Sequence, residues 1–126
     1  MHSKMYILIK DWIDPGHAVN SCAHAGAMIE SNFPRKVQVI SDEKPHPKPV
    51  GYIDDPVMKD WYDNSFRKVT CRVTEKEFEK AKKYDDWFVV TEMAFANDNY
   101  PNDEVVLVFK PRVEWPRFFN FLKLWK

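Results

Sequence analysis

The segment EVVLVFK, residues 104–110, constrains the fold most, because its interior is a continuous apolar run. A strand with one face in water alternates apolar and polar side chains, whereas a strand covered on both faces is apolar throughout. The segment therefore predicts a central strand of a sheet that carries helices on both faces. With 126 residues, of which 44% are hydrophobic, the chain is long and apolar enough for one such domain.

Three other segments are predicted to be strands of the same sheet. Residues 5–10 (MYILIK) form a short apolar run, and residues 67–73 (RKVTCRV) alternate as a half-buried strand does. Residues 87–93 (WFVVTEM) are joined to 104–110 by a polar loop of ten residues. We expect these last two strands to pair antiparallel.

Helix signals lie between the predicted strands. Asp14-Pro15 is an N-cap followed by a proline at the first helical position, and Thr74 with Glu77 forms a capping box. The predicted helices cover residues 15–31, 56–64, 75–84 and 113–122. The predicted fold class is α/β: one domain over 1–126, with a four-stranded mixed β-sheet flanked by helices on both faces.

A proline-rich segment, residues 34–56, interrupts this pattern. It holds Pro34, Pro45, Pro47, Pro49 and Pro56. Within it, KVQVI (36–40) is a candidate strand with VGYI (50–53) as its partner, and we interpret the rest as a loop inserted in the domain.

Charge and cysteine content limit the functional classes. Lysine plus arginine number 19, and aspartate plus glutamate also number 19. This balance excludes a surface that is basic all round and binds nucleic acid everywhere, but it leaves room for a local basic patch. The C-terminal stretch is locally basic, with Lys110, Arg112, Arg117, Lys123 and Lys126. It could bind phosphates or simply be a solvated helix. Its aromatic residues, Trp115, Phe118, Phe119, Phe121 and Trp125, are expected mainly in the core.

The chain shows no signal for export or for a membrane. The apolar run near the N-terminus is too short for a signal peptide or a membrane span. Cys22 and Cys71 lie inside apolar elements, and we expect two buried thiols in a reducing cytoplasm.

The helix predicted over 15–31 has no charged residue from His17 to Ile29. Its polar residues fall at i, i+3, i+4 and i+7, which places them on one face: His17, Asn20, Ser21 and His24. The opposite face is apolar: Ala18, Val19, Cys22, Ala25, Gly26 and Ile29. The polar face either lines a cleft that receives a ligand or is covered by another element that satisfies it.

The position of His17 favours the cleft. It lies in the first helical turn, where unpaired N–H groups and the positive end of the helix dipole attract anions. That environment disfavours imidazolium, so a neutral, basic His17 is expected. His17 and His24 are two turns, or roughly 10 Å, apart. They are too distant to share one ion, so neither a metal nor a cofactor is predicted.

The order of these motifs resembles a known family. The strand MYILIK, a turn with Gly16 and a helix with Cys22-Ala23-His24-Ala25 are followed by Trp61. RKVTCRV with its TEKE-capped helix, VVLVFKP and the terminal FLKLWK complete the pattern. Together they resemble the type II peptidyl-tRNA hydrolases of archaea and eukaryotes, in a divergent branch with a degenerate active-site signature.

The resemblance implies a fold and a reaction. The family has a four-stranded mixed sheet flanked by helices, and it hydrolyses the ester that joins a peptide to the terminal ribose of tRNA. His17 stands where the family has its catalytic lysine, and Glu92 stands for the family aspartate. The family threonine and arginine have no counterpart in EMAFAN, residues 92–97.

These considerations give a set of candidate site residues. His17 is the predicted general base, Glu92 its orienting acid, and Asn20, with N–H groups of the first helical turn, the predicted oxyanion donor. The predicted substrate-binding residues are Ser21, His24, Lys10, Asn97, Lys110 and Arg112.

Two functions remain open at this stage. One is a hydrolase of peptidyl-tRNA or aminoacyl-tRNA esters. The other is a non-catalytic relative that binds RNA, a nucleotide or a protein through the same cleft. The expected partner is tRNA or peptidyl-tRNA, with a homodimer left open and no membrane.

Overall fold

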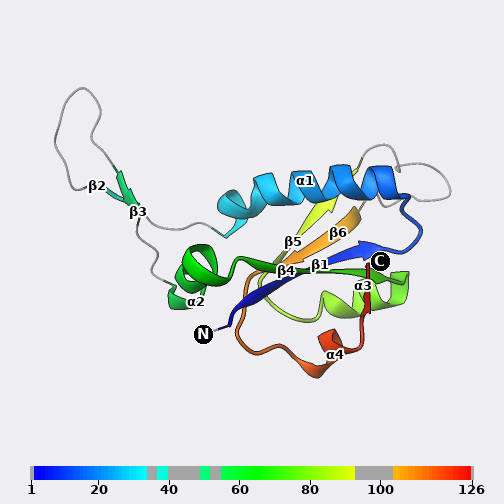
Figure 1. The fold of residues 1–126 in the computed structure, drawn as a ribbon. Helices are drawn as coiled ribbons and strands as arrows, with labels where there is room; N and C mark the ends of the chain where they lie inside the picture. The colour runs from blue at the N-terminus through cyan, green and yellow to red at the C-terminus, as the bar shows by residue number, and fades with distance from the viewer. Residues whose placement is uncertain (1, 34–36, 40–48, 52–54, 93–103, 126) are drawn as a thin grey trace.

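The computed structural model describes residues 2–33, 37–39, 49–51, 55–92 and 104–125 (Figure 1). Its main sheet has five strands in the order β5-β6-β1-β4-β7. They are β1 (Lys4–Lys10), β4 (Arg67–Val73), β5 (Trp87–Thr91), β6 (Glu104–Phe109) and β7 (Lys123–Leu124). β1 and β4 run parallel, and the other neighbours pair antiparallel, so the sheet is mixed.

Helices cover both faces of this sheet. α1 (Pro15–Asn32) lies across one face, and α3 (Glu75–Ala81) and α4 (Arg117–Asn120) lie under the other (Figure 1). α2 (Pro56–Asp60) continues into a π-helical turn, η1 (Trp61–Ser65), where one helix to residue 64 was expected. Among the described residues, no helix combines the length and the apolar content that crossing a bilayer requires. The mixed five-stranded sheet with helices on both faces confirms the predicted α/β class.

The central strand β1 divides the interior into two cores. Met5, Ile7 and Ile9 point to the α1 face, whereas Tyr6 and Leu8 point to the face that α3 and α4 cover. Successive side chains of a strand alternate between faces, so a strand buried on both sides needs apolar residues throughout. β6 obeys the same rule, and its five residues from Val105 to Phe109 are all buried. It is an interior strand, as its sequence predicts, although β1 occupies the centre.

The predicted starts of α1 and α3 are confirmed by their contacts. The side chain of Asp14 accepts from the backbone N–H of His17, and Pro15 is the first residue of α1. At α3, Thr74 Oγ1 accepts from Glu77 N at 3.1 Å, and Glu77 Oε1 accepts from Thr74 N at 2.9 Å. Each cap satisfies N–H groups that a helix cannot satisfy internally.

The C-terminal segment differs from the helix predicted over 113–122. Only Arg117–Asn120 is helical, because Pro116 has no N–H to donate and starts α4 late. Beyond α4 the chain joins the sheet as β7, and Trp125 N donates to Thr70 O at 2.9 Å. The chain after α4 therefore pairs with β4 instead of continuing as a helix. This pairing adds a fifth strand to the four that were expected.

Part of the proline-rich insertion is described. β2 (Val37–Val39) and β3 (Pro49–Gly51) pair antiparallel in a separate hairpin, which confirms the predicted pairing. Residues 34–36, 40–48 and 52–54 lie outside the described part of the chain.

The buried stripe of α1 is rotated from the predicted apolar face. Val19 is 72% exposed and Gly26 is exposed, whereas Ser21 is 0% exposed. The helix packs toward β5 and β6, so Ser21 turns inward with Ala18 and Ala25. Burial of a hydroxyl requires a hydrogen-bond partner, and Glu92 is that partner.

Candidate functional site

An aspartate–histidine pair forms at the first turn of α1. His17 Nδ1 donates to Asp14 Oδ1 at 2.5 Å, and His17 N donates to Asp14 Oδ2 at 3.2 Å. The two carboxylate oxygens thus cap the helix and hold the imidazole at the same time. Asp14 was predicted only as a helix cap, and the Asp-x-x-His spacing at a helix start is the signal that could have revealed the pair.

This pair has the arrangement of a general base with its orienting acid. A carboxylate on Nδ1–H fixes the tautomer in which a neutral imidazole carries its lone pair on Nε2. The side chain of His17 is 44% exposed, so the ring lies at the surface. The side-chain hydrogen bond from His17, and then that from its backbone N–H, hold the pKa of Asp14 below its ordinary value of 3.8. The carboxylate is therefore charged at neutral pH.

One turn further along α1, the end of β5 meets the helix. The Asn20 amide donates to Glu92 Oε2 at 3.5 Å and lies 3.3 Å from His24 Nε2. Ser21 Oγ donates to the same Glu92 oxygen at 3.4 Å. The four side chains form one chain of contacts beside the Asp14–His17 pair.

The structure corrects the predicted partner of His17. Glu92 was expected to orient the imidazole, but it bonds to Asn20 and Ser21, and Asp14 takes the orienting position. The reason is geometric: Asp14 is three residues from His17 on the same helical turn, whereas Glu92 reaches α1 one turn later.

Lys10 does not belong to this group. It follows Tyr6 and Leu8 in the alternation of β1 and so lies on the opposite face of the sheet, only 2% exposed. Its ammonium pairs with Glu75 at 3.2 Å and lies 4.7 Å from the centroid of the Phe78 ring. The substrate-binding role predicted for Lys10 is wrong for the site on α1.

Lys110 and Arg112 lie at the other end of the sheet. β6 runs antiparallel to β1, so residues after β6 return to the start of β1, where Lys4 and Arg112 bridge. α1 begins beyond the far end of β1. These two cations are therefore separated from His17 by the length of the strand, against expectation. Asn97 lies outside the described residues.

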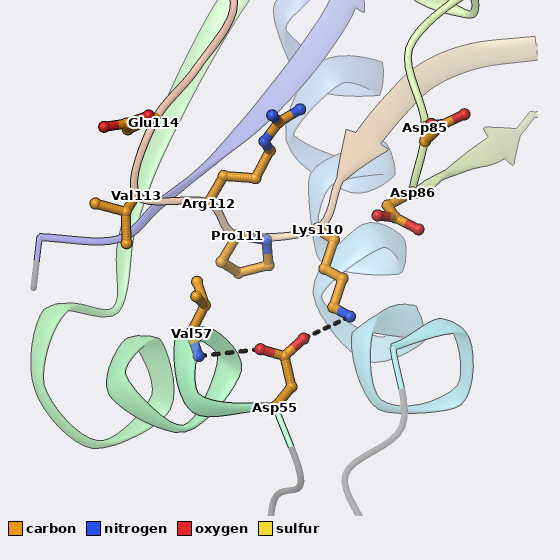
Figure 2. Close-up of a pocket in the computed structure, with 9 residues that line it drawn as sticks. All are labelled: Asp55, Val57, Asp85, Asp86, Lys110, Pro111, Arg112, Val113 and Glu114. Carbon is orange, nitrogen blue, oxygen red and sulfur yellow. Dashed lines mark hydrogen bonds and ion pairs between the residues drawn. The ribbon is translucent and has the colours of Figure 1, made fainter.

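Lys110 and Arg112 line a separate pocket of about 610 Å³ (Figure 2). Its lining is mixed in charge: Asp55, Val57, Asp85, Asp86, Lys110, Pro111, Arg112, Val113 and Glu114. Lys110 Nζ pairs with Asp55 Oδ2 at 2.7 Å, and Asp55 also caps α2. Burial raises the pKa of Asp55, but the bonds from Lys110 and from two backbone N–H groups outweigh it and lower that pKa. Lys110 is thus committed to a structural contact.

Within the described ranges, no three histidine, cysteine, aspartate or glutamate side chains group as a metal site would need. The side chains gathered at α1 instead suit proton transfer and hydrogen bonding. Imidazole, carboxylate, amide and hydroxyl are the groups that activate water and hold a polar substrate.

The fold and the site together define an α/β protein with a five-stranded mixed sheet and a polar, uncharged helix face. No protein-family model matches the chain, and no curated protein sequence matches it significantly. Among solved structures, the chain is similar to a protein of unknown function from Agrobacterium tumefaciens. The TM-score is 0.56 and the identity 10%, covering 100% of this chain and 99% of the other. At that identity the likeness concerns the fold alone.

Proposed function

We propose that the chain hydrolyses the ester between an acyl group and the 3′ end of tRNA, as the resemblance to type II peptidyl-tRNA hydrolases suggests. The observation that supports it is the Asp14–His17 pair at the start of α1, with Nδ1 held 2.5 Å from the carboxylate. Ester hydrolysis at neutral pH needs a positioned base to deprotonate water, and the pair has that form.

In this mechanism His17 Nε2 takes a proton from water as the oxygen attacks the ester carbonyl. Asp14 stabilises the imidazolium that forms. The tetrahedral intermediate then collapses: the bond to the ribose oxygen breaks, and His17 returns the proton to that oxygen. The products are a free carboxylic acid and a tRNA 3′ hydroxyl.

The developing oxyanion needs hydrogen-bond donors. In the first turn of α1, His17 N is bonded to the Asp14 side chain, Ala18 N to Asp14 O, and Pro15 has no N–H. Gly16 supplies the remaining first-turn N–H. The Asn20 amide is the second donor in the proposal, and one of its two N–H groups, which are directed at Glu92 and His24, turns to the oxyanion when the substrate binds.

The test compares four proteins on N-acetyl-aminoacyl-tRNA. We expect wild type to release the acyl group above the spontaneous rate, and His17→Ala to lower the rate constant by roughly 10²–10⁴-fold. Asp14→Asn should lower it similarly, because asparagine still caps the helix but no longer fixes the tautomer or stabilises imidazolium. His2→Ala, which removes an exposed histidine outside the site, is the matched control.

A non-catalytic binding role is the second candidate. Asn20 and Ser21 donate hydrogen bonds to Glu92, which connect α1 to the end of β5. These contacts stabilise the fold whether or not the site catalyses a reaction. Absence of turnover together with salt-sensitive tRNA binding would select this candidate. Turnover that survives both His17→Ala and Asp14→Asn would eliminate the proposed base.

A further inference from the structure

A hollow of about 510 Å³ lies between α3 and α4, on the sheet face opposite α1. Two stretches of the chain about forty residues apart build it, so it has no linear motif. Its lining residues are Lys76, Glu77, Lys80, Tyr84, Arg117, Phe118, Phe121 and Leu122.

Aromatic rings form the apolar part of this hollow. Phe121 is 73% exposed, although its neighbours Phe119 and Leu122 are buried in the core. Phe118 is half-buried and stacks on Tyr84, with ring centroids 5.7 Å apart and planes inclined by 27°. An exposed phenyl ring beside a stacked pair offers flat faces that the protein's own core does not use.

Cations surround these rings. The Lys80 ammonium lies 5.6 Å from the centroid of Phe118, and the Arg117 guanidinium lies 5.6 Å from that of Phe121. Lys76 adds a third positive charge to the lining. Among the described residues, one carboxylate lines the hollow, that of Glu77, and it accepts a hydrogen bond from the backbone N–H of Thr74 in the capping box. The hollow is therefore net positive around an aromatic surface.

We propose that this hollow binds single-stranded RNA, with a base stacked on Phe121 and the neighbouring phosphates paired with Lys76, Lys80 and Arg117. Stacking on aromatic side chains combined with basic contacts to the backbone is the usual chemistry of single-strand recognition. An uncharged apolar ligand would leave three cations unused, and a simple anion would leave the rings unused. The cations stand on both α3 and α4, so phosphates on either side of one stacked base can each meet a charge.

This inference is independent of ester hydrolysis. The hollow and the Asp14–His17 pair lie on opposite faces of the sheet, and they share no residue. Loss of one function should therefore leave the other intact.

The test is the fluorescence anisotropy of labelled single-stranded oligoribonucleotides, oligo(U) and oligo(A), titrated with the full chain at low salt. We expect binding to both, because stacking tolerates any base. About three phosphate contacts predict a slope near −2 for log K against log salt concentration. Phe121→Ala should weaken binding at least about fivefold, and Lys80→Ala should also reduce the salt slope.

Matched controls separate the hollow from general surface effects. Val19→Ala removes another exposed apolar side chain, on α1, and Lys59→Ala removes an exposed lysine on α2. Both should leave affinity unchanged. No RNA binding at low salt, or affinity unaffected by Phe121→Ala, would overturn the proposal. Binding to anionic phospholipid vesicles that depends on Phe121, without RNA binding, would overturn it as well.

Discussion

Asp14 performs two tasks at the start of α1. It caps the helix and pairs with the imidazole of His17, and both contacts use its charged form. The spacing of a cap and its third helical residue brings the two side chains together without any tertiary contact. The pair could therefore have been predicted from the sequence, whereas the contact of Glu92 with Asn20 and Ser21 depends on how β5 docks against α1.

The lowered pKa of Asp14 predicts a pH dependence of stability. A carboxyl whose folded pKa is below its unfolded value stabilises the fold at pH values above that unfolded value. The contribution is lost as the pH falls through the lower folded pKa. In urea unfolding between about pH 5 and pH 2, wild type should lose more free energy of unfolding than Asp14→Asn. Equal losses in the two proteins would show that the charged form of Asp14 does not stabilise the fold above this pH range.

Lys10 shows where residue patterns mislead. Its position after an apolar strand resembles that of an exposed strand-end charge, yet the alternation of β1 turns it into the core beside Phe78. Counting from Tyr6 and Leu8 assigns its face correctly. If β1 is taken as buried on both faces, the face of the sheet on which Lys10 lies could have been predicted from the sequence. The ion pair with Glu75 could not, because it depends on how α3 packs against β1.

At the scale of elements, α3 is defined by its capping box. Thr74 and Glu77 satisfy two backbone N–H groups reciprocally, and α3 is only seven residues long. A short helix depends strongly on its cap. Thr74→Ala should lower the free energy of unfolding by about 1 kcal/mol, measured by urea denaturation.

Thr74→Ser is the matched variant for this cap, because serine keeps the hydroxyl that accepts from Glu77 N. It should lose much less stability than Thr74→Ala. If both variants lose the same amount, the methyl group of Thr74 rather than the cap is responsible.

The elements differ in how far the sequence predicts them. β6 follows from its apolar run, and the starts of α1 and α3 follow from their cap residues. These signals are local, so they do not depend on how the rest of the chain packs. The region from 113 to 122 has a helical pattern of aromatics, yet Pro116 and the pairing of β7 with β4 decide its structure. Strand pairing over that distance is a tertiary property, which helical periodicity cannot show.

For the whole molecule, topology explains which predicted site residues come together. His17, Asn20, Ser21, His24 and Glu92 gather because α1 starts, and β5 ends, at the same end of the sheet. The antiparallel direction of β6 places Lys110 and Arg112 at the other end. The direction of β6 relative to β1 has no local signal in the sequence, so this separation could not be predicted.

The two cysteines report on the integrity of the whole fold. Cys71 is 0% exposed in the core beneath α3, and burial, reinforced by the charge of Glu77, raises its pKa to about 11. Cys22 is half-buried, and burial raises its pKa as well. Because the thiolate is the reactive form, Cys71 should react with a disulfide reagent only when the protein unfolds.

Cys22→Ala leaves Cys71 as the single thiol and makes this measurement direct. We expect its reaction in native buffer to be far slower than in urea, and to accelerate in parallel with unfolding followed by fluorescence. Fast reaction in native buffer would show that the core beneath α3 opens locally.

The central place of β1 has a consequence for how the protein is made. Leu8 is paired on one side with Cys71 and on the other with Leu107, so β1 borders two strands that are synthesised much later than β1 itself. Contacts between distant positions form slowly. While β6 is still inside the ribosome, the nascent chain exposes an apolar strand edge, and that edge is where we expect a chaperone to be needed.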